Sequence, residues 1–169
     1  MPQLTDPNFA RAVVLLWEHR DEGAMGLIVN HPTETRASQI IQLDPRVEGT
    51  GDLDVWIGGP VEPTRGWLLL AGQDADGAEI CPGIYLSASL DRLRRAMESN
   101  ETASRCRFLV GYAGWGPKQL DNELAASAWL TVPLNVDLVF DTPSDQMWER
   151  AIRRLGIDPS ALAMGPGIH

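Results

Sequence analysis

The hydrophobic positions of this chain fall into short runs that alternate between strand-like and helix-like spacing. Residues 9–17 and 24–30 contain continuous apolar runs typical of strands covered on both faces, and the polar link EHRDEG between them predicts a hairpin. Further strands are predicted at residues 55–57, 67–71 and 84–87, and in RCRFLVGY at 105–112. WLTVPL and DLVF are predicted as two more short strands, the first ending near Pro133.

Helical spacing predicts four helices between these strands. A short helix is expected within residues 35–43, and an amphipathic helix from residue 90 to about 99, with Ser89 as its cap and Leu90, Leu93 and Met97 as its apolar stripe. A third helix should begin at Pro117, because proline is well suited to the first helical position.

The last predicted helix has signals at both ends. Thr142 is the expected cap, Pro143 the first helical residue and Gly156 the stop. Its buried stripe is predicted to comprise Met147, Trp148, Ala151, Ile152 and Leu155. Because strands and helices interleave without a regular βαβ rhythm, and no repeat or linker divides the chain, we predict one α+β domain over residues 1–169, with a flexible tail from about residue 163.

Composition narrows the functional classes. A hydrophobic content of 44% in 169 residues is ordinary for a globular protein, and no apolar run is long enough to span a membrane. The N-terminus lacks the pattern of a signal peptide, so a cytoplasmic protein is expected. The net charge of −9 and the pI near 4.7 oppose binding to duplex DNA, although residues 89–118 are locally basic.

The glycine-rich turn GYAGWGPKQ invites comparison with a phosphate-binding loop. The N–H groups of Gly114 and Gly116 could hold an anion beside Lys118, since they precede a predicted helix. The turn lacks the Gly-Lys-Ser/Thr order of a nucleotide-binding P-loop. The alternative is a structural turn that caps the helix.

Arginines supply the other candidate ligand groups. Arg65 follows the sharp turn GGPV, where it could bind a ligand or brace the turn. Arg95 and Arg107 belong to a locally basic middle that could receive a phosphate, a nucleic acid or an acidic partner, or could simply be solvated. The basic side chains of this middle are Arg92, Arg94, Arg95, Arg105, Arg107 and Lys118.

Signals for catalysis or metal binding are sparse. His19 lies among Glu18, Asp21 and Glu22, which could orient it as a base or add metal ligands, but charged turns are usually solvated. A site with two histidines would need His31 close by. The chain has no GxSxG motif. We therefore expect no catalytic residue, metal or cofactor.

The two cysteines form no recognisable motif. Cys81 and Cys106 stand far apart in the sequence without a CxxC or a Cys/His cluster, so we expect them to be reduced. Cys106 should face inward, because it alternates with Arg105 and Arg107 on a strand. The flanking arginines would lower the pKa of an exposed thiol, which leaves a redox role as an alternative.

Four segments in order resemble one bacterial family. DPNFARAVVLLWEHRDEGAMGLIVNHP, GGPVEPTRGWLLL, GYAGWGPKQLDNELAASAWL and LVFDTPSDQMWERAIRRLGID are similar to motifs of the AlgH/YqgE family. The resemblance implies a large mixed, partly self-folded β-sheet, flanked by three to four helices. The chain departs from the family pattern at Trp17, where cysteine is often found, at His31, where arginine is usual, and at Lys118, where glycine is common.

The family has no established biochemical activity, although some members carry a transcriptional regulator label. The resemblance and the residues together predict a cytoplasmic binding or regulatory module without catalysis. Its partner would be a protein or a small anionic ligand, with no nucleic acid and no membrane expected. The alternatives are a DNA-binding regulator, as in the label, and a cryptic enzyme or thiol redox protein.

Overall fold

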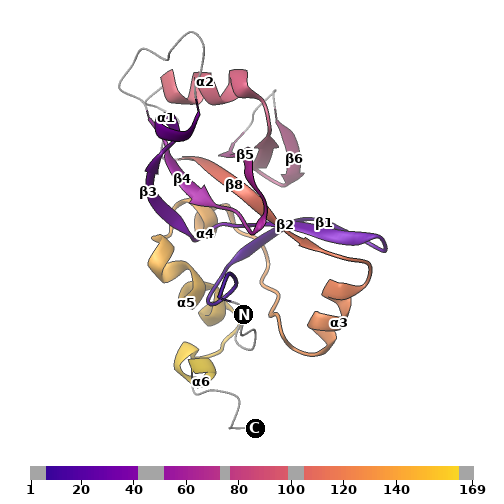
Figure 1. Ribbon diagram of the computed structural model, residues 1–169. Coiled ribbons are helices and arrows are strands. Elements are labelled where there is room, and N and C mark those ends of the chain that lie inside the picture. Colours follow the sequence, from indigo (N-terminus) through magenta and orange to yellow (C-terminus); the bar gives the residue numbers. More distant parts are fainter. Residues whose placement is uncertain (1–6, 42–51, 73–76, 99–104, 164–169) are drawn as a thin grey trace. The chain divides into compact units, whose positions relative to one another are not determined.

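The computed structural model describes residues 7–41, 52–72, 77–98 and 105–163 (Figure 1). The chain divides into two compact units: the first comprises Met1–Asn30 and Ala113–His169, and the second comprises His31–Tyr112. The division into two compact units does not test the predicted single domain over residues 1–169, which stays a prediction. The predicted tail lies almost entirely outside the described residues.

The first unit begins with the predicted hairpin. β1 (Val14–Arg20) and β2 (Gly23–Ile28) pair antiparallel, with Val14 opposite Ile28. Only residues 21 and 22 remain between the strands, so the turn is tighter than the polar link EHRDEG suggested. β2 then pairs with the last residues of β8 (Cys106–Trp115), which continues into this unit.

Among the described residues four helices complete the first unit, and two predicted strands are not found there. α3 spans Gln119–Ala125, α4 Val136–Phe140, α5 Ser144–Arg154 and α6 Pro159–Ala163. WLTVPL is not a strand, and DLVF lies in α4, where the Asn135 side chain accepts a hydrogen bond from the Asp137 N–H at 2.8 Å. A short apolar run such as DLVF is compatible with the spacing of a strand and with that of a helix. The Asn135 cap favours the helix here.

The predicted last helix is confirmed as α5, with small changes at its start. Pro143 occupies the N-cap position and the helix begins at Ser144, one residue later than predicted. Its predicted stripe is buried except for Leu155, which is half-buried. Gly156 has φ +74°, the left-handed conformation expected at a helix stop.

The second unit is built on a mixed sheet with strand order β3-β4-β8-β5-β7-β6. β4 runs parallel to β8, and the other pairs are antiparallel. The strands are β3 (Pro32–Arg36), β4 (Asp54–Ile57), β5 (Val61–Ala71), β6 (Ala78–Cys81) and β7 (Ile84–Ser87). β3 and β6 were missed because both are too polar to produce a strand pattern. A mixed sheet with helices confirms the predicted α+β class.

Two helices, α1 (Ala37–Ile40) and α2 (Leu90–Glu98), lie at one end of this unit (Figure 1). Both contribute buried residues to one core cluster with β4, β5 and β8. The predicted stripe of α2 is partly wrong: Leu90 is 61% exposed, whereas Arg92 is only 8% exposed. Within the described residues, six helices replace the expected three or four, because the extra ones are short.

A close approach between two glycines joins the GGPV turn to β8. Gly111 has φ +74°, and a Cβ atom there would lie 2.2 Å from the Gly59 carbonyl oxygen. The neighbouring Gly58 N–H donates a hydrogen bond to the Val110 carbonyl at 2.8 Å. No side chain fits at residue 111, so this backbone contact explains why the residue there is glycine.

We expect Gly111→Ala to lower the free energy of unfolding by about 2–5 kcal/mol, since it adds a backbone clash to a left-handed φ. Urea unfolding would measure the change. Gly156→Ala is the matched control, because Gly156 has the same φ of +74° and nothing within 4 Å of the added Cβ. That variant should lose only about 1–2 kcal/mol. Equal losses in both variants would show that the contact with Gly59 contributes nothing.

Candidate functional site

A groove with a volume of ≈ 330 Å³ opens in the second unit between β5, the end of β7 and the start of α2. Its lining is mainly apolar, with contributions from Ile41, Trp67, Leu68, Leu90, Leu93 and Phe108. Leu68, Leu93 and Phe108 are buried, whereas Leu90 is largely exposed. The groove therefore has a dry apolar base and an apolar rim open to solvent.

Arg65 is the one charged side chain among the described residues that line this groove. Its guanidinium lies 4.3 Å from the centre of the Trp67 ring and forms an ion pair of 3.2 Å with Glu62. The aromatic ring fixes the guanidinium in place, while the ion pair is about half exposed and is therefore weak. Arg65 thus contacts Glu62 and Trp67 of its own strand and also lines the groove, and its bracing of the GGPV turn stays a prediction.

A bulge in β5 places Arg65 at this position. Residues 62–65 of β5 lie opposite Gly111 alone, because Val61 pairs with Tyr112 and Gly66 with Val110. Glu62 within the bulge has φ +45°, which is unusual for a residue with a side chain. Bulges of this kind turn side chains out of the regular sheet pattern and often occur beside binding sites.

Hydroxyl groups form the other polar part of the lining. The Ser87 Oγ accepts a hydrogen bond from the Ser89 N–H, and the Ser89 Oγ accepts one from the Arg92 N–H, both at 3.2 Å. The predicted cap of α2 is thereby confirmed. Both hydroxyl hydrogens remain available as donors within the described part of the chain. Sequence reasoning had noted Ser89 only as a cap and had missed Ser87, Thr64 and Trp67, which carry no motif.

Gly114 and Gly116 of the glycine-rich turn lie in the first unit, where α3 supplies a neighbouring carboxylate. The Gly116 N–H donates to Gln119 Oε1 at 3.0 Å, and Gln119 Nε2 donates to Glu123 Oε1 at 3.0 Å. Glu123 Oε2 accepts the indole N–H groups of Trp115 and Trp129, at 3.0 and 2.7 Å. Together with Phe9, these two rings form an aromatic cluster. This network supports the structural alternative for the turn.

The predicted start of the following helix is wrong. α3 begins at Gln119 rather than Pro117, with Lys118 at its N-cap and φ +59°. Gly114 lies within β8 opposite Met25, and Lys118 is exposed. Anion binding by Gly114, Gly116 and Lys118 stays a prediction, and these residues belong to a different unit from Arg65.

The cations of the basic middle differ in burial and belong to two units. Arg92 is buried in α2, and Arg95 is exposed on the same helix. Arg107 is half-buried on β8, where its guanidinium lies 5.1 Å from the centre of the Trp56 ring and donates to the Cys106 carbonyl at 3.3 Å. Lys118 belongs to the first unit. A role for Arg95 or Arg107 in ligand binding stays a prediction.

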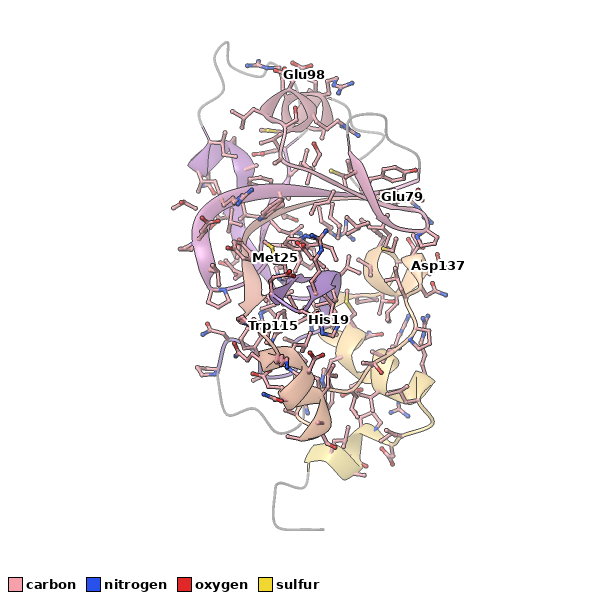
Figure 2. All side chains as sticks on the ribbon, turned by 90° about the vertical axis from the view of Figure 1, so that its right-hand side faces the viewer. His19, Met25, Glu79, Glu98, Trp115 and Asp137 are labelled. Carbon is pink, nitrogen blue, oxygen red and sulfur yellow. The ribbon has the colours of Figure 1, made fainter. Side chains whose placement is uncertain are left out.

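His19 finds its partner outside the acidic cluster noted in the sequence. His19 Nε2 lies 2.8 Å from Asp121 Oδ1 of α3, while Glu18 pairs with Arg20. His19 and Trp115 both lie beside α3 in Figure 2. His31 belongs to the second unit. Across residues 7–41, 52–72, 77–98 and 105–163, no group of three His, Cys, Asp or Glu side chains is placed to hold a metal.

Both cysteines are free thiols. Cys106 is 3% exposed, as predicted from its alternation with arginines. Burial, aided by the charge of Glu79, raises the pKa of the Cys81 thiol. A raised pKa lowers the thiolate fraction at neutral pH, so this environment disfavours redox chemistry at Cys81. In the part of the chain that the structure describes, no helix is long and apolar enough to cross a membrane.

Comparison with known proteins establishes the family. The AlgH-like family model matches residues 1–160, so the chain belongs to the AlgH-like family. A UPF0301 protein of Myxococcus xanthus is 38% identical over 174 residues, covering 100% of this chain and 94% of the relative. A UPF0301 protein of Laribacter hongkongensis is 41% identical over 167 residues, covering 96% of this chain and 89% of the relative.

Two solved structures share the fold. The solution structure of the AlgH protein from Pseudomonas aeruginosa has a TM-score of 0.76 at 34% identity, covering 100% of this chain and 92% of that protein. A crystal structure of a Corynebacterium diphtheriae protein has a TM-score of 0.73 at 20% identity, covering 95% and 84%, and shows the fold alone. The resemblance noted in the sequence is thereby confirmed. These relatives indicate no catalytic function, and the molecular function of the family is unknown.

We expect both thiols to react at least about tenfold more slowly in the folded protein at pH 7 than in urea, because one is buried and the pKa of the other is raised. The absorbance released by a disulfide reagent such as DTNB would follow the reaction, and Cys81→Ser would separate the two thiols. Folded-state labelling as fast as labelling in urea would restore the thiol redox alternative.

His31 should make the second unit acid-sensitive. Burial lowers the pKa of its imidazole, so the folded state binds fewer protons than the unfolded state, whose histidine pKa is about 6.5. The folded state keeps its full stability at His31 while the pH is above the unfolded-state pKa of about 6.5. As the pH falls below that value, protonation of His31 favours the unfolded state and stability is lost. His31→Gln should therefore flatten the loss of unfolding free energy between pH 7.5 and 5.5 in urea titrations. An unchanged slope would contradict this role.

Proposed function

We propose that this protein is a cytoplasmic, non-catalytic binding module that takes a small anionic ligand with an apolar body in the groove beside Arg65. The observation that supports this most directly is the charge of the lining. In a chain with a net charge of −9, the described lining of the groove carries one charged side chain, and that side chain is a cation. An anion in this groove would therefore meet an opposite charge without an opposing carboxylate in the lining.

The contacts of Arg65 would allow a ligand anion to replace the Glu62 carboxylate as its partner. Its ion pair with Glu62 is about half exposed, and such pairs contribute about 0–1 kcal/mol. Replacing Glu62 by a ligand anion would cost the protein only this weak ion pair. Burial of the ligand's apolar body in the groove would then favour binding. Stacking on Trp67 would keep the guanidinium in place during that exchange.

The two alternative functions have weaker support. A DNA-binding regulator needs a continuous basic surface, but Arg92 is buried, Arg107 is half-buried and Lys118 belongs to the other unit. A thiol redox protein needs an accessible thiolate, but Cys106 is buried and the pKa of Cys81 is raised. A module that binds small anions would use Arg65 together with the apolar and hydroxyl side chains that line the same groove.

Isothermal titration at low ionic strength with octyl sulfate and octyltrimethylammonium tests the proposal, because the two probes differ in charge but share an apolar chain. We expect the anion to bind and the cation not to bind. Arg65→Gln should lower the affinity for octyl sulfate roughly 10–100-fold, which corresponds to the loss of one hydrogen bond to a charged group.

Arg154→Gln is the matched control, since Arg154 is an exposed arginine of α5 in the other unit. It should leave the affinity unchanged, and thermal unfolding would show that both variants are folded. Equal binding of the cationic probe, or unchanged affinity in Arg65→Gln, would contradict the proposal.

A further inference from the structure

We infer that the anionic group received by the groove is a carboxylate, held by the Ser87 hydroxyl together with the Arg65 guanidinium. This inference rests on the proposed function and specifies its ligand as a small carboxylic acid with an apolar chain. Three observations carry it: the buried hydroxyl, the single cationic charge, and the apolar base and rim of the groove.

Ser87 is a buried hydroxyl with an unused donor. Its side chain belongs to a residue that is 5% exposed at the end of β7, opposite Leu68 of β5, and both residues line the groove. The oxygen accepts the Ser89 N–H through one lone pair, and the hydroxyl hydrogen can be donated to a ligand. Among the described residues the oxygen thus has a partner, whereas its hydrogen has no acceptor. A ligand acceptor atom would satisfy it.

The neighbouring serine adds a second donor of the same kind. Ser89 Oγ accepts the Arg92 N–H at the start of α2, and its hydroxyl hydrogen is available to another acceptor. Ser89 is exposed, so water can also take this hydrogen. Two serine hydroxyls that can both donate, beside a guanidinium that can only donate, favour a ligand group that accepts several hydrogen bonds, as an ionised carboxylate does.

Charge balance favours a carboxylate over a phosphate. The described lining supplies one guanidinium, which would neutralise one negative charge of a ligand that displaced the half-exposed Glu62 carboxylate. An alkyl phosphate above its second pKa of about 6 carries nearly two charges, so one would remain uncompensated beside an apolar wall. A carboxylate carries one charge, and its two oxygens match the planar fork of an arginine.

The apolar residues define the rest of the ligand. Leu68, Leu93 and Phe108 form a buried base, and Gly66 leaves room for Phe108, whose ring would lie 2.8 Å from an added Cβ. Leu90 is 61% exposed at the rim, where an alkyl chain could cover it. The volume of ≈ 330 Å³ lies at the lower end of the range of small-molecule sites, about 300–1,000 Å³, which favours a small acid over a protein segment.

The test compares octanoate, octyl phosphate and octanol at pH 8 by isothermal titration. We expect octanoate to bind most tightly. Ser87→Ala should lower the affinity for octanoate about tenfold, which corresponds to the loss of one hydrogen bond to a charged group. The affinity for octanol should not change. Ser160→Ala, at an exposed serine of α6, is the control and should change neither affinity.

The outcomes separate this inference from the proposed function. Tighter binding of octyl phosphate, or unchanged octanoate affinity in Ser87→Ala, would overturn the carboxylate assignment while leaving a site for small anions. Failure of octanoate, octyl phosphate and octyl sulfate to bind would overturn both. A tetrapeptide with a free C-terminal leucine is the last probe: binding tighter than that of octanoate would show that the carboxylate belongs to a protein terminus and would overturn the assignment to a small acid.

Discussion

The backbone contact between Gly59 and Gly111 is the constraint on which the second unit depends. β8 passes so close to the GGPV turn that residue 111 has no room for a side chain, and the Gly58 N–H joins the same strand at Val110. On one side β8 pairs in parallel with β4, and on the other it pairs with β5. The site opposite Gly111 is also where β5 bulges, so one glycine accommodates both the turn and the bulge.

The candidate site follows from this arrangement. The bulge carries Arg65 out of the regular alternation of β5, and the Trp67 ring then holds the guanidinium. β7 ends at Ser87 beside β5, and Ser89 begins α2 two residues later. A cation, two hydroxyl donors and an apolar base thus meet because three elements of the second unit end or bend at one place. None of these side chains belongs to a sequence motif for binding.

The glycine-rich turn shows how a loop can resemble an anion site for structural reasons. β8 ends close beside β2, where a Cβ at Gly23 of β2 would lie 2.5 Å from the Trp115 carbonyl oxygen. Glu123 then supplies an internal carboxylate that receives both indole N–H groups and the Gln119 amide. The Gly116 N–H is taken by the neutral Gln119 side chain, which in turn donates to Glu123, so these polar contacts of the loop are made within the chain.

The sequence by itself determined the α+β class, the hairpin, the cores of most strands, α2 and α5, the inward position of Cys106 and the family. These features depend on local periodicity, capping residues and ordered motifs, all of which are properties of neighbours in the chain. The sequence also singled out Arg65. Only the tertiary structure decided that DLVF is helical, that Leu90 is exposed while Arg92 is buried, and that Arg65 shares a groove with Ser87. Those outcomes depend on strand register and on contacts between residues far apart in sequence, which no local pattern contains.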